Sequence, residues 1–271
     1  MRIGILGCGT IGSYVLNSLM NGNIPGCEVA VVCVRSEGSR GVSKVRGYGI
    51  PLVTDIEEML NYHPQAIIES ASHEALQQHG KTILRAGIDL IPLSLGALVN
   101  AELLETLTGA ARDCGSILHI PSGGIGGLDA LQAAVNTQVY EVTMTSRKPP
   151  VAWKNITYVQ SLNLDLDRMT EPTLLYEGSA RDCVTKFPQN INIAAALSLA
   201  GVGFDRTQIR IMADPTVTLN THEIHCEGES GRFHMVLENL PVPENPKTTY
   251  MACISAIAAL KRIRSHYRIG T

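Results

Sequence analysis

The stretch RIGILGCGTIG, residues 2–12, decides how this chain begins to fold. A short apolar run ends in a glycine turn, and the apolar residues that follow recur at helical spacing, which predicts a strand, a turn and a helix. Gly7, Gly9 and Gly12 form the pattern G-x-G-x-x-G across that turn. The first glycine permits a tight turn, the second lets the backbone approach a diphosphate, and the third allows close helix–strand packing. In this context the pattern predicts a dinucleotide-binding turn.

The next segments continue to alternate between strands and helices. We expect strands at 28–34, 66–70, 88–93 and 116–120, and helices at 55–62, 74–86 and 101–113. Thr54, with Glu57 three residues later, is a capping-box pattern for the first of these helices, and a glycine closes each of the other two. Such alternation produces parallel βαβ units with helices on both faces of one sheet. The sequence therefore predicts an α/β protein with a Rossmann-type doubly wound parallel sheet.

The pattern changes at PSGGIGG, residues 121–127, which reads as a flexible loop. A helix is expected at 128–135, and 221–227 and 232–238 alternate in polarity around a glycine-containing turn, which predicts an antiparallel hairpin. Apolar residues at helical spacing over 247–264 predict a last helix that packs back onto the first domain. We expect a dinucleotide-binding domain at 1–120 and 246–271, and an α+β domain for substrate binding and dimerisation at 121–245.

Composition narrows the class of protein. The chain has 271 residues, a formal net charge of −3 and no basic field for nucleic acid or an anionic membrane. Its seven cysteines are scattered, odd in number and without a CxxC pair, which argues against a disulfide framework and a zinc site. No apolar stretch is long enough to span a bilayer. We expect a cytoplasmic protein with no membrane or nucleic-acid partner and no metal.

The end of the second expected strand bears on cofactor choice. The acid that binds the adenosine ribose in NAD-dependent relatives of this fold falls at Val34, and Arg35 follows, with further cations nearby. Two readings stay open. Arg35 either binds the 2′-phosphate of NADP or stacks on adenine in a solvated loop.

Several uncommon short sequence motifs along the chain resemble those of the L-aspartate dehydrogenase family. They are GCGTIG at 7–12, ESAS at 69–72, SLGAL at 94–98, PSGGIGGLDAL at 121–131, TSRKPP at 145–150, KFPQNINIAAALSLAG at 186–201, DPT at 214–216, NTHEI at 220–224 and ENPKT at 244–248. The resemblance implies oxidative deamination of L-aspartate through iminoaspartate to oxaloacetate and ammonia, with NAD or NADP as cofactor. It also implies a supply of iminoaspartate to pyridine nucleotide biosynthesis, and we expect a homodimer.

The resemblance also implies particular residues. The catalytic histidine falls on His222, and cofactor contacts fall on Gly124, through its backbone amide, and on Asn190. The chain departs from the family at Gly124 and Gly126, where alanine is usual, and at Val34. A backbone contact tolerates the glycines, whereas Val34 concerns only the choice between NAD and NADP. The full set of candidate cofactor residues is Gly7, Gly9, Thr10, Ile11, Gly12, Arg35, Ala71, Ser94, Gly124 and Asn190.

The geometry of a β-strand predicts which residues around His222 face inward. Residues two apart share a face, so His222, Ile224 and Cys226 point inward while the intervening residues face solvent. His222 and His225 therefore lie on opposite faces, which argues against a metal pair. The spacing by itself favours a core histidine satisfied by hydrogen bonds, and the resemblance favours a proton-transfer residue.

A substrate with two carboxylates needs cations and amide donors beside it. The candidates are Arg147, Lys148, Lys247 and Asn220, with Ser94 as a further neutral donor. Surface charge or loop capping would account for each of them equally well. Alternatives also stay open for two other candidates. Asn190 either contacts the cofactor or serves as a helix cap, and the loop at 122–127 either contacts a ligand through its amides or serves as a hinge.

Three hypotheses for the function follow. The chain is an L-aspartate dehydrogenase, a dehydrogenase or reductase of another small amino or hydroxy acid, or a protein that senses NAD(P) without turnover. A sensor has no need of a proton-transfer residue such as His222.

Overall fold

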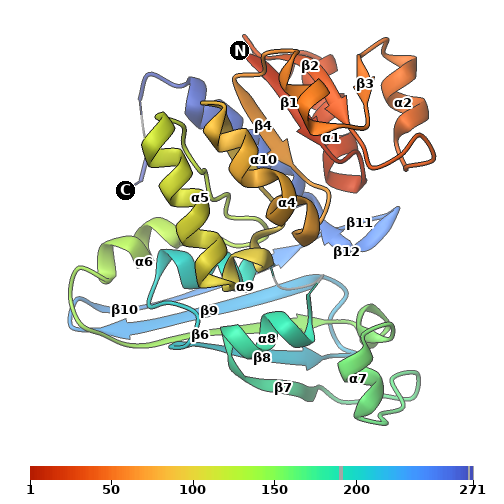
Figure 1. Ribbon diagram of the computed structural model, residues 1–271. Coiled ribbons are helices and arrows are strands. Elements are labelled where there is room, and N and C mark those ends of the chain that lie inside the picture. Colours follow the sequence, from red (N-terminus) through yellow and green to blue (C-terminus); the bar gives the residue numbers. More distant parts are fainter. Residues whose placement is uncertain (189–191, 268, 271) are drawn as a thin grey trace. The chain divides into compact units, whose positions relative to one another are not determined.

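The computed structural model describes residues 1–188, 192–267, 269 and 270, and the side chains of all of these except 246 and 247. The chain divides into two compact units. The first unit comprises Met1–Pro121 with Ala252–Tyr267, and the second comprises Ser122–Met251. Figure 1 shows the elements of each.

The first unit is built on a parallel sheet. Its strands are β1 (Arg2–Leu6), β2 (Glu28–Cys33), β3 (Leu52–Val53), β4 (Ala66–Glu69) and β5 (Asp89–Pro92), in the order β3-β2-β1-β4-β5. The strand order reverses at β1, which creates a crevice at the carboxyl ends of β1 and β4 where such sheets bind ligands. This arrangement confirms the expected Rossmann-type fold.

Helices and their caps follow the predicted pattern closely in this unit. They are α1 (Thr10–Met20), α2 (Val42–Gly47), α3 (Ile56–Leu60), α4 (His73–Arg85), the 3₁₀ turn η1 (Leu95–Val99) and α5 (Ala101–Cys114). The capping expectation at Thr54 was wrong by one residue, because the Asp55 carboxylate accepts the hydrogen bond from the amide of Glu58. Gly115 closes α5 in the left-handed conformation, as expected.

The strand expected at 116–120 does not form. The chain makes a single bridge between Leu118 and Leu90 of the edge strand, with hydrogen bonds on either side of Leu90 only. Ile117 is 54% exposed, so this segment lacks the two covered faces of a central strand.

The last helix, α10 (Tyr250–Arg264), belongs to the core of the first unit through Ala256 and Leu260. It begins three residues later than expected, because Asn245–Thr249 forms β12, which pairs with β11 (Pro241–Val242). Its buried face is formed by small side chains and not by its largest apolar ones. The small residues Cys253 and Ala256 face inward and allow a close approach, while Met251 and Ile254 are exposed.

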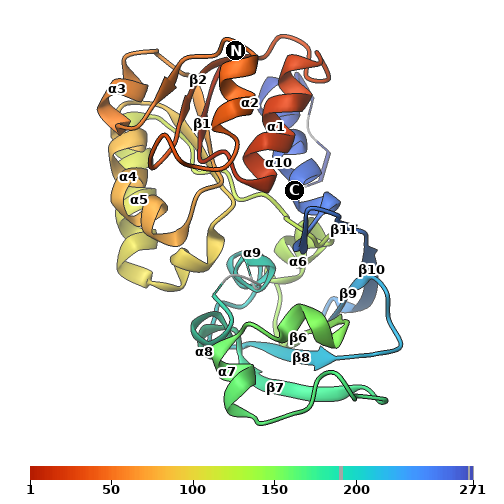
Figure 2. The same ribbon diagram turned by 90° about the vertical axis from the view of Figure 1, so that its right-hand side faces the viewer.

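The second unit is a mixed sheet with helices along one face. Its strands are β6 (Val139–Lys148), β7 (Thr173–Ser179), β8 (Thr207–Ala213), β9 (Asn220–Gly228) and β10 (Gly231–Asn239), in the order β10-β9-β6-β8-β7. All neighbours are antiparallel except β6 and β8. The helical segments are α6 (Leu128–Ala134), η2 (Pro150–Trp153), α7 (Thr157–Ser161), α8 (Ala180–Lys186) and α9 (Asn192–Ala200). In Figure 2, α8 and α9 lie on one side of this sheet.

The hairpin predicted from alternating polarity is confirmed. β9 pairs with β10 from Gly228↔Gly231 to Asn220↔Asn239, and Gly231 has a positive φ of 116° beside the turn. None of the helices in the described residues combines the length and apolarity that a membrane crossing requires.

Candidate active site

The glycine turn after β1 needs its glycines for three different reasons. Gly7 has φ +89°, and a Cβ there would lie 2.6 Å from the Cα of Ala71. A Cβ on Gly12 would lie 2.1 Å from the carbonyl oxygen of Gly7, so only glycine allows α1 to pack this closely. A Cβ on Gly9 would meet nothing within 4 Å, so its backbone borders open space. Thr10 and Ile11 begin α1, and no side chain caps that helix at Gly9. These features suit a diphosphate held at the start of α1.

The end of β2 places its two candidate residues differently. Val34 is 3% exposed and packs in the core of the first unit, whereas Arg35 is exposed. Of these two side chains, only that of Arg35 is therefore accessible to a ligand, because the side chain of Val34 points inward. Arg46, in α2, is already paired with Glu37 at 2.9 Å.

Glu69, at the end of β4, is a residue that the sequence reasoning did not single out. It is fully buried, and its carboxylate accepts hydrogen bonds from the amides of Ala71, Ser72 and Ser94 and from the hydroxyl of Ser94. Two candidate cofactor residues, Ala71 and Ser94, thus share one acceptor. The signal in the sequence was an acid at the end of an otherwise apolar strand, AIIE.

His222 lies on β9, in the second unit, and is 3% exposed. Its face is the predicted inward one, with Ile224 and Cys226 also buried and His225 on the other side. Its Nδ1 lies 3.1 Å from the hydroxyl of Ser146, which pairs directly opposite on β6. Burial, and then the positive charge of Lys148, lower the pKa of His222 to about 3, so the imidazole is neutral at pH 7.

Lys148 and Asn220 share this face with His222. Lys148 is two residues after Ser146 on β6, is 3% exposed, and has its ammonium 5.0 Å from the centre of the Trp153 ring. Asn220 is two residues before His222 on β9 and is 3% exposed. We refer to His222, Ser146, Lys148 and Asn220 as the His222 cluster. Its four polar side chains gather at one end of this sheet face.

Gly124 is tied to the same end of the sheet. The side-chain amide of Asn239, which pairs with Asn220, donates to the carbonyl oxygen of Gly124 at 2.7 Å. A Cβ on Gly124 would lie 3.3 Å from the hydroxyl of Thr249 and 3.4 Å from Nδ2 of Asn239. An alanine would therefore fit after small adjustments, in keeping with a contact made by the backbone.

Arg147 is not part of the His222 cluster. It faces the opposite side of the sheet, where its guanidinium lies 2.7 Å from Glu223 and 3.8 Å from Asp214. Asn190 and the side chain of Lys247 fall outside the described residues.

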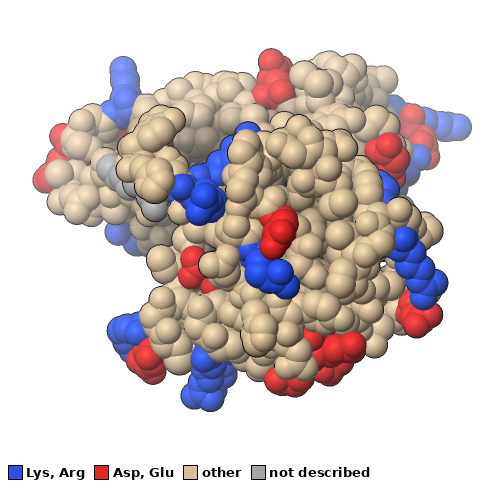
Figure 3. All heavy atoms as spheres, turned by 90° about the horizontal axis from the view of Figure 1, so that it is seen from above, with Lys and Arg blue, Asp and Glu red and all other residues tan. Residues whose placement is uncertain are grey.

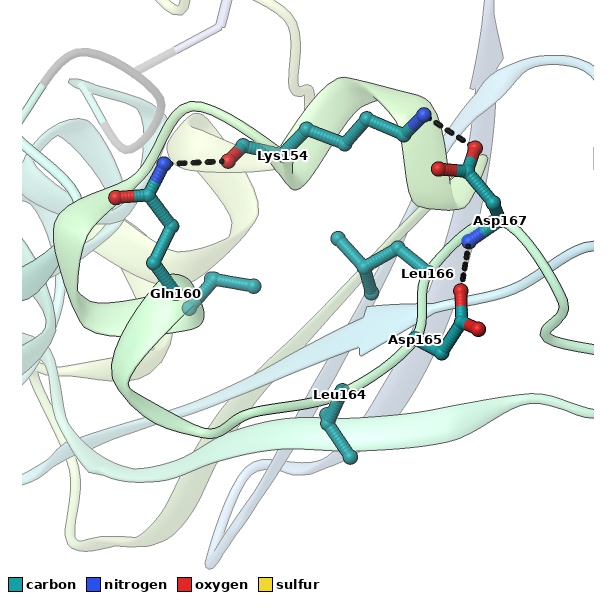
Figure 4. Close-up of a pocket in the computed structure, with 7 residues that line it drawn as sticks. Lys154, Gln160, Leu164, Asp165, Leu166 and Asp167 are labelled. Atoms are coloured by element: carbon teal, nitrogen blue, oxygen red, sulfur yellow. Dashed lines mark hydrogen bonds and ion pairs between the residues drawn. The ribbon is translucent and has the colours of Figure 1, made fainter.

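The surface also carries a pocket beside α7 and a face with mixed charges. A pocket of about 280 Å³ opens beside α7, where the side chain of Gln160 donates to the carbonyl of Lys154, and Lys154 pairs with Asp167 (Figure 4). None of the residues that line it is a candidate for the site. On the face shown in Figure 3, Lys and Arg side chains are interspersed with Asp and Glu and form no basic patch.

Comparison with known proteins defines the class first. Residues 7–121 match the family model of the homoserine dehydrogenase NAD binding domain, and residues 129–263 match that of the aspartate dehydrogenase C-terminal region. A dehydrogenase-type nucleotide-binding sheet is thus combined with a second sheet that carries the His222 cluster.

The particular family follows from full-length relatives. The chain is 41% identical to an L-aspartate dehydrogenase of Methanosarcina mazei, with 100% of both chains covered. It is 38% identical to L-aspartate dehydrogenase 3 of Bordetella bronchiseptica, over 100% of this chain and 98% of that one. The crystal structure of aspartate dehydrogenase from Thermotoga maritima superposes with a TM-score of 0.78 at 25% identity, covering 100% and 99% of the chains. The chain belongs to the L-aspartate dehydrogenase family.

Proposed function

We propose that this chain oxidatively deaminates L-aspartate through iminoaspartate to oxaloacetate and ammonia, with NAD or NADP as the hydride acceptor. The observation that carries the proposal is the His222 cluster: a neutral, buried imidazole whose Nδ1 is held by Ser146, on the same sheet face as a buried cation and amide. The names of the full-length relatives support aspartate as the substrate.

The first unit supplies what a dinucleotide needs. Gly7 and Gly12 close the turn, Gly9 leaves open space at the start of α1, and Arg35 is exposed beyond β2. These residues fit a dinucleotide cofactor and would hold its diphosphate and adenosine. When it is bound, the nicotinamide ring supplies the hydride acceptor.

In the second unit, we assign proton transfer to Nε2 of His222. If Nδ1 donates its proton to the Ser146 oxygen, Nε2 keeps a lone pair that can take a proton from the substrate ammonium group. Once that proton has passed to solvent, the same lone pair can take a proton from the attacking water and give it to the departing ammonia. Lys148 and Asn220 are assigned to a substrate carboxylate. A bound carboxylate offsets the charge of Lys148, which raises the pKa of His222 from its depressed value and makes it a stronger base once substrate is present.

Two rival functions are separated by one assay. Aspartate and, separately, other small amino and hydroxy acids are mixed with the protein and NAD or NADP, and the absorbance of the reduced nicotinamide is followed. Turnover of aspartate above the other acids supports the proposal. Preference for another acid identifies a different dehydrogenase, and cofactor binding without turnover of any acid identifies a sensor.

We propose a homodimer formed through the face of the second sheet that the helices leave uncovered, where the pairing register places Leu174 and Met212 beside Arg147 and places Val236 on the same face in the opposite edge strand. Val236 is 51% exposed and Leu174 is 46% exposed, so both edges of this face carry apolar surface for a partner chain to cover. Light scattering after size exclusion would contradict this if it gave the mass of one chain. We also infer a cytoplasmic location and a supply of iminoaspartate to pyridine nucleotide biosynthesis.

A further inference from the structure

Glu69 combines complete burial with four hydrogen bonds from two separate turns. Its Oε1 accepts from the amides of Ala71 and Ser72 at 2.7 and 3.0 Å and from the Ser94 hydroxyl at 2.9 Å. Its Oε2 accepts from the amide of Ser94 at 3.2 Å. Ala71 and Ser72 follow β4, and Ser94 follows β5. One carboxylate therefore joins two neighbouring turns at the carboxyl edge of the sheet.

The same turn also contacts the glycine turn after β1. The hydroxyl of Ser70 donates to the carbonyl oxygen of Gly7 at 2.8 Å, and the space beside the Cα of Gly7 is filled by Ala71. The turns after β1, β4 and β5 are thus linked in series, from the diphosphate-binding glycines to Ser94.

A buried carboxylate is costly, and no salt bridge within the described part of the chain offsets that cost for Glu69. Burial raises the pKa of Glu69 to about 7, opposed by its hydrogen bonds from Ala71, Ser94 and Ser72. An apolar residue would continue the pattern of Ala66, Ile67 and Ile68 and would add to the core without this cost. The hydrogen bonds of Glu69 therefore indicate that this acid serves to fix the turns after β4 and β5. It does not serve to stabilise strand β4.

We propose that Glu69 is a positioning residue for the dinucleotide, holding the backbones of Ala71 and Ser94 in the arrangement that receives its nicotinamide half. The inference rests on the proposed cofactor site. In a doubly wound sheet the two halves of a dinucleotide lie on opposite sides of the reversal in strand order. Arg35 follows β2 on one side, so the turns after β4 and β5 lie on the side of the nicotinamide nucleoside. Glu69 has no exposed surface and acts only through the groups it holds.

The test is Glu69→Gln, because this substitution removes the hydrogen bond from the Ser94 amide and can keep the other three. With its carbonyl in place of Oε1, glutamine keeps three of the bonds, and its NH₂ group then faces the amide of Ser94, donor against donor. Titrations of the full-length protein with NADH, NADPH and ADP-ribose are compared with wild type. We expect the Kd of both reduced cofactors to rise about tenfold and the Kd of ADP-ribose, which lacks nicotinamide, to change less than about threefold.

The matched control is Asp89→Asn. Asp89 is also a partly buried carboxylate of the first unit that accepts a backbone hydrogen bond, from Ile117 at 2.8 Å, but it lies at the opposite, amino end of β5. This variant is expected to lower the melting temperature while its cofactor Kd stays within about twofold of wild type. If Glu69→Gln does not fold, Glu69→Asp, which keeps the charge but withdraws it, is measured with the same ligands and the same expectation.

Three outcomes overturn different claims. Wild-type affinity for NADH in the folded Glu69 variant overturns the positioning role. Equal weakening of ADP-ribose and NADH also overturns it, because the effect is then a general loss of structure. A wild-type protein that binds neither NADH nor NADPH overturns the proposed cofactor site instead.

Discussion

His222→Asn separates a catalytic histidine from a structural one. An alanine at this position would leave a void under β9 and remove the partner of the Ser146 hydroxyl, at a cost of about 1–3 kcal/mol for the unpaired group alone. Asparagine ends where Nδ1 lies, so it keeps the hydrogen bond to Ser146 and removes only Cε1 and Nε2 of the ring. The stability cost is then about 1 kcal/mol.

The expected loss is in turnover. Removing a positioned acid–base group lowers the rate about 10²-fold or more, which corresponds to about 2.7 kcal/mol of transition-state stabilisation. Initial rates with aspartate and both cofactors, the Kd for NADH and the melting temperature are measured on the same preparation. The control is His225→Asn, the same change on the opposite face of the same strand, which is expected to keep wild-type turnover within about twofold.

The reasoning is refuted if the folded asparagine variant binds NADH and deaminates aspartate at close to the wild-type rate. A purely structural histidine would give a different result. Melting temperature, cofactor affinity and turnover would then fall together.

Three further predictions concern the pH dependence of stability and the cofactor site. The folded-state pKa of His222 is lowered from 6.5 to about 3, so the unfolded state takes up the proton first and stability is lost as pH falls below 6.5, by up to about 1.4 kcal/mol per pH unit. His222→Asn, about 1 kcal/mol less stable than wild type at pH 7, should therefore become about 1 kcal/mol more stable than wild type at pH 5, measured by urea titration, and an unchanged difference would contradict the buried neutral imidazole. Arg35→Ala should raise the Kd for NADPH about tenfold and leave that for NADH within about twofold if the guanidinium binds the 2′-phosphate, whereas equal weakening of both would support adenine stacking. Gly9→Ala should keep the wild-type melting temperature, because its methyl group meets nothing, yet weaken NADH binding at least tenfold, whereas Gly12→Ala should lose stability as well. Unchanged NADH affinity in the Gly9 variant would place the diphosphate elsewhere.

The structure argues against restoring the ribose-binding acid at its usual position, which Val34 occupies. Placing the ribose-binding acid at Val34 would bury a carboxylate in the core of the first unit, where Val34 packs. Arg35→Asp is the appropriate substitution, because that side chain is exposed.

Local patterns determined much of this protein. The glycine spacing at 7–12 predicted a turn in which Gly7 and Gly12 are required sterically, and period-two alternation predicted both the 220–239 hairpin and the inward face of His222. These features follow from backbone conformation over a few residues, which neighbouring side chains specify. The prediction was wrong for a segment that pairs with its neighbouring strand at one residue only. Residues 116–120 were expected to form a strand because they are apolar, but pairing with a neighbour decides whether a strand forms.

The partners of the site residues were decided only by tertiary structure. Ser146 and His222 are 76 positions apart, and the antiparallel register of β6 and β9 sets their side chains opposite each other. The same register places Arg147 on the far face, paired with Glu223, although its neighbour Lys148 lies with His222. Glu69 likewise acquires its role from turns that follow two different strands. Hydrogen bonds and charges act over a few ångströms in space, and only the pairing of distant strands determines which residues come that close.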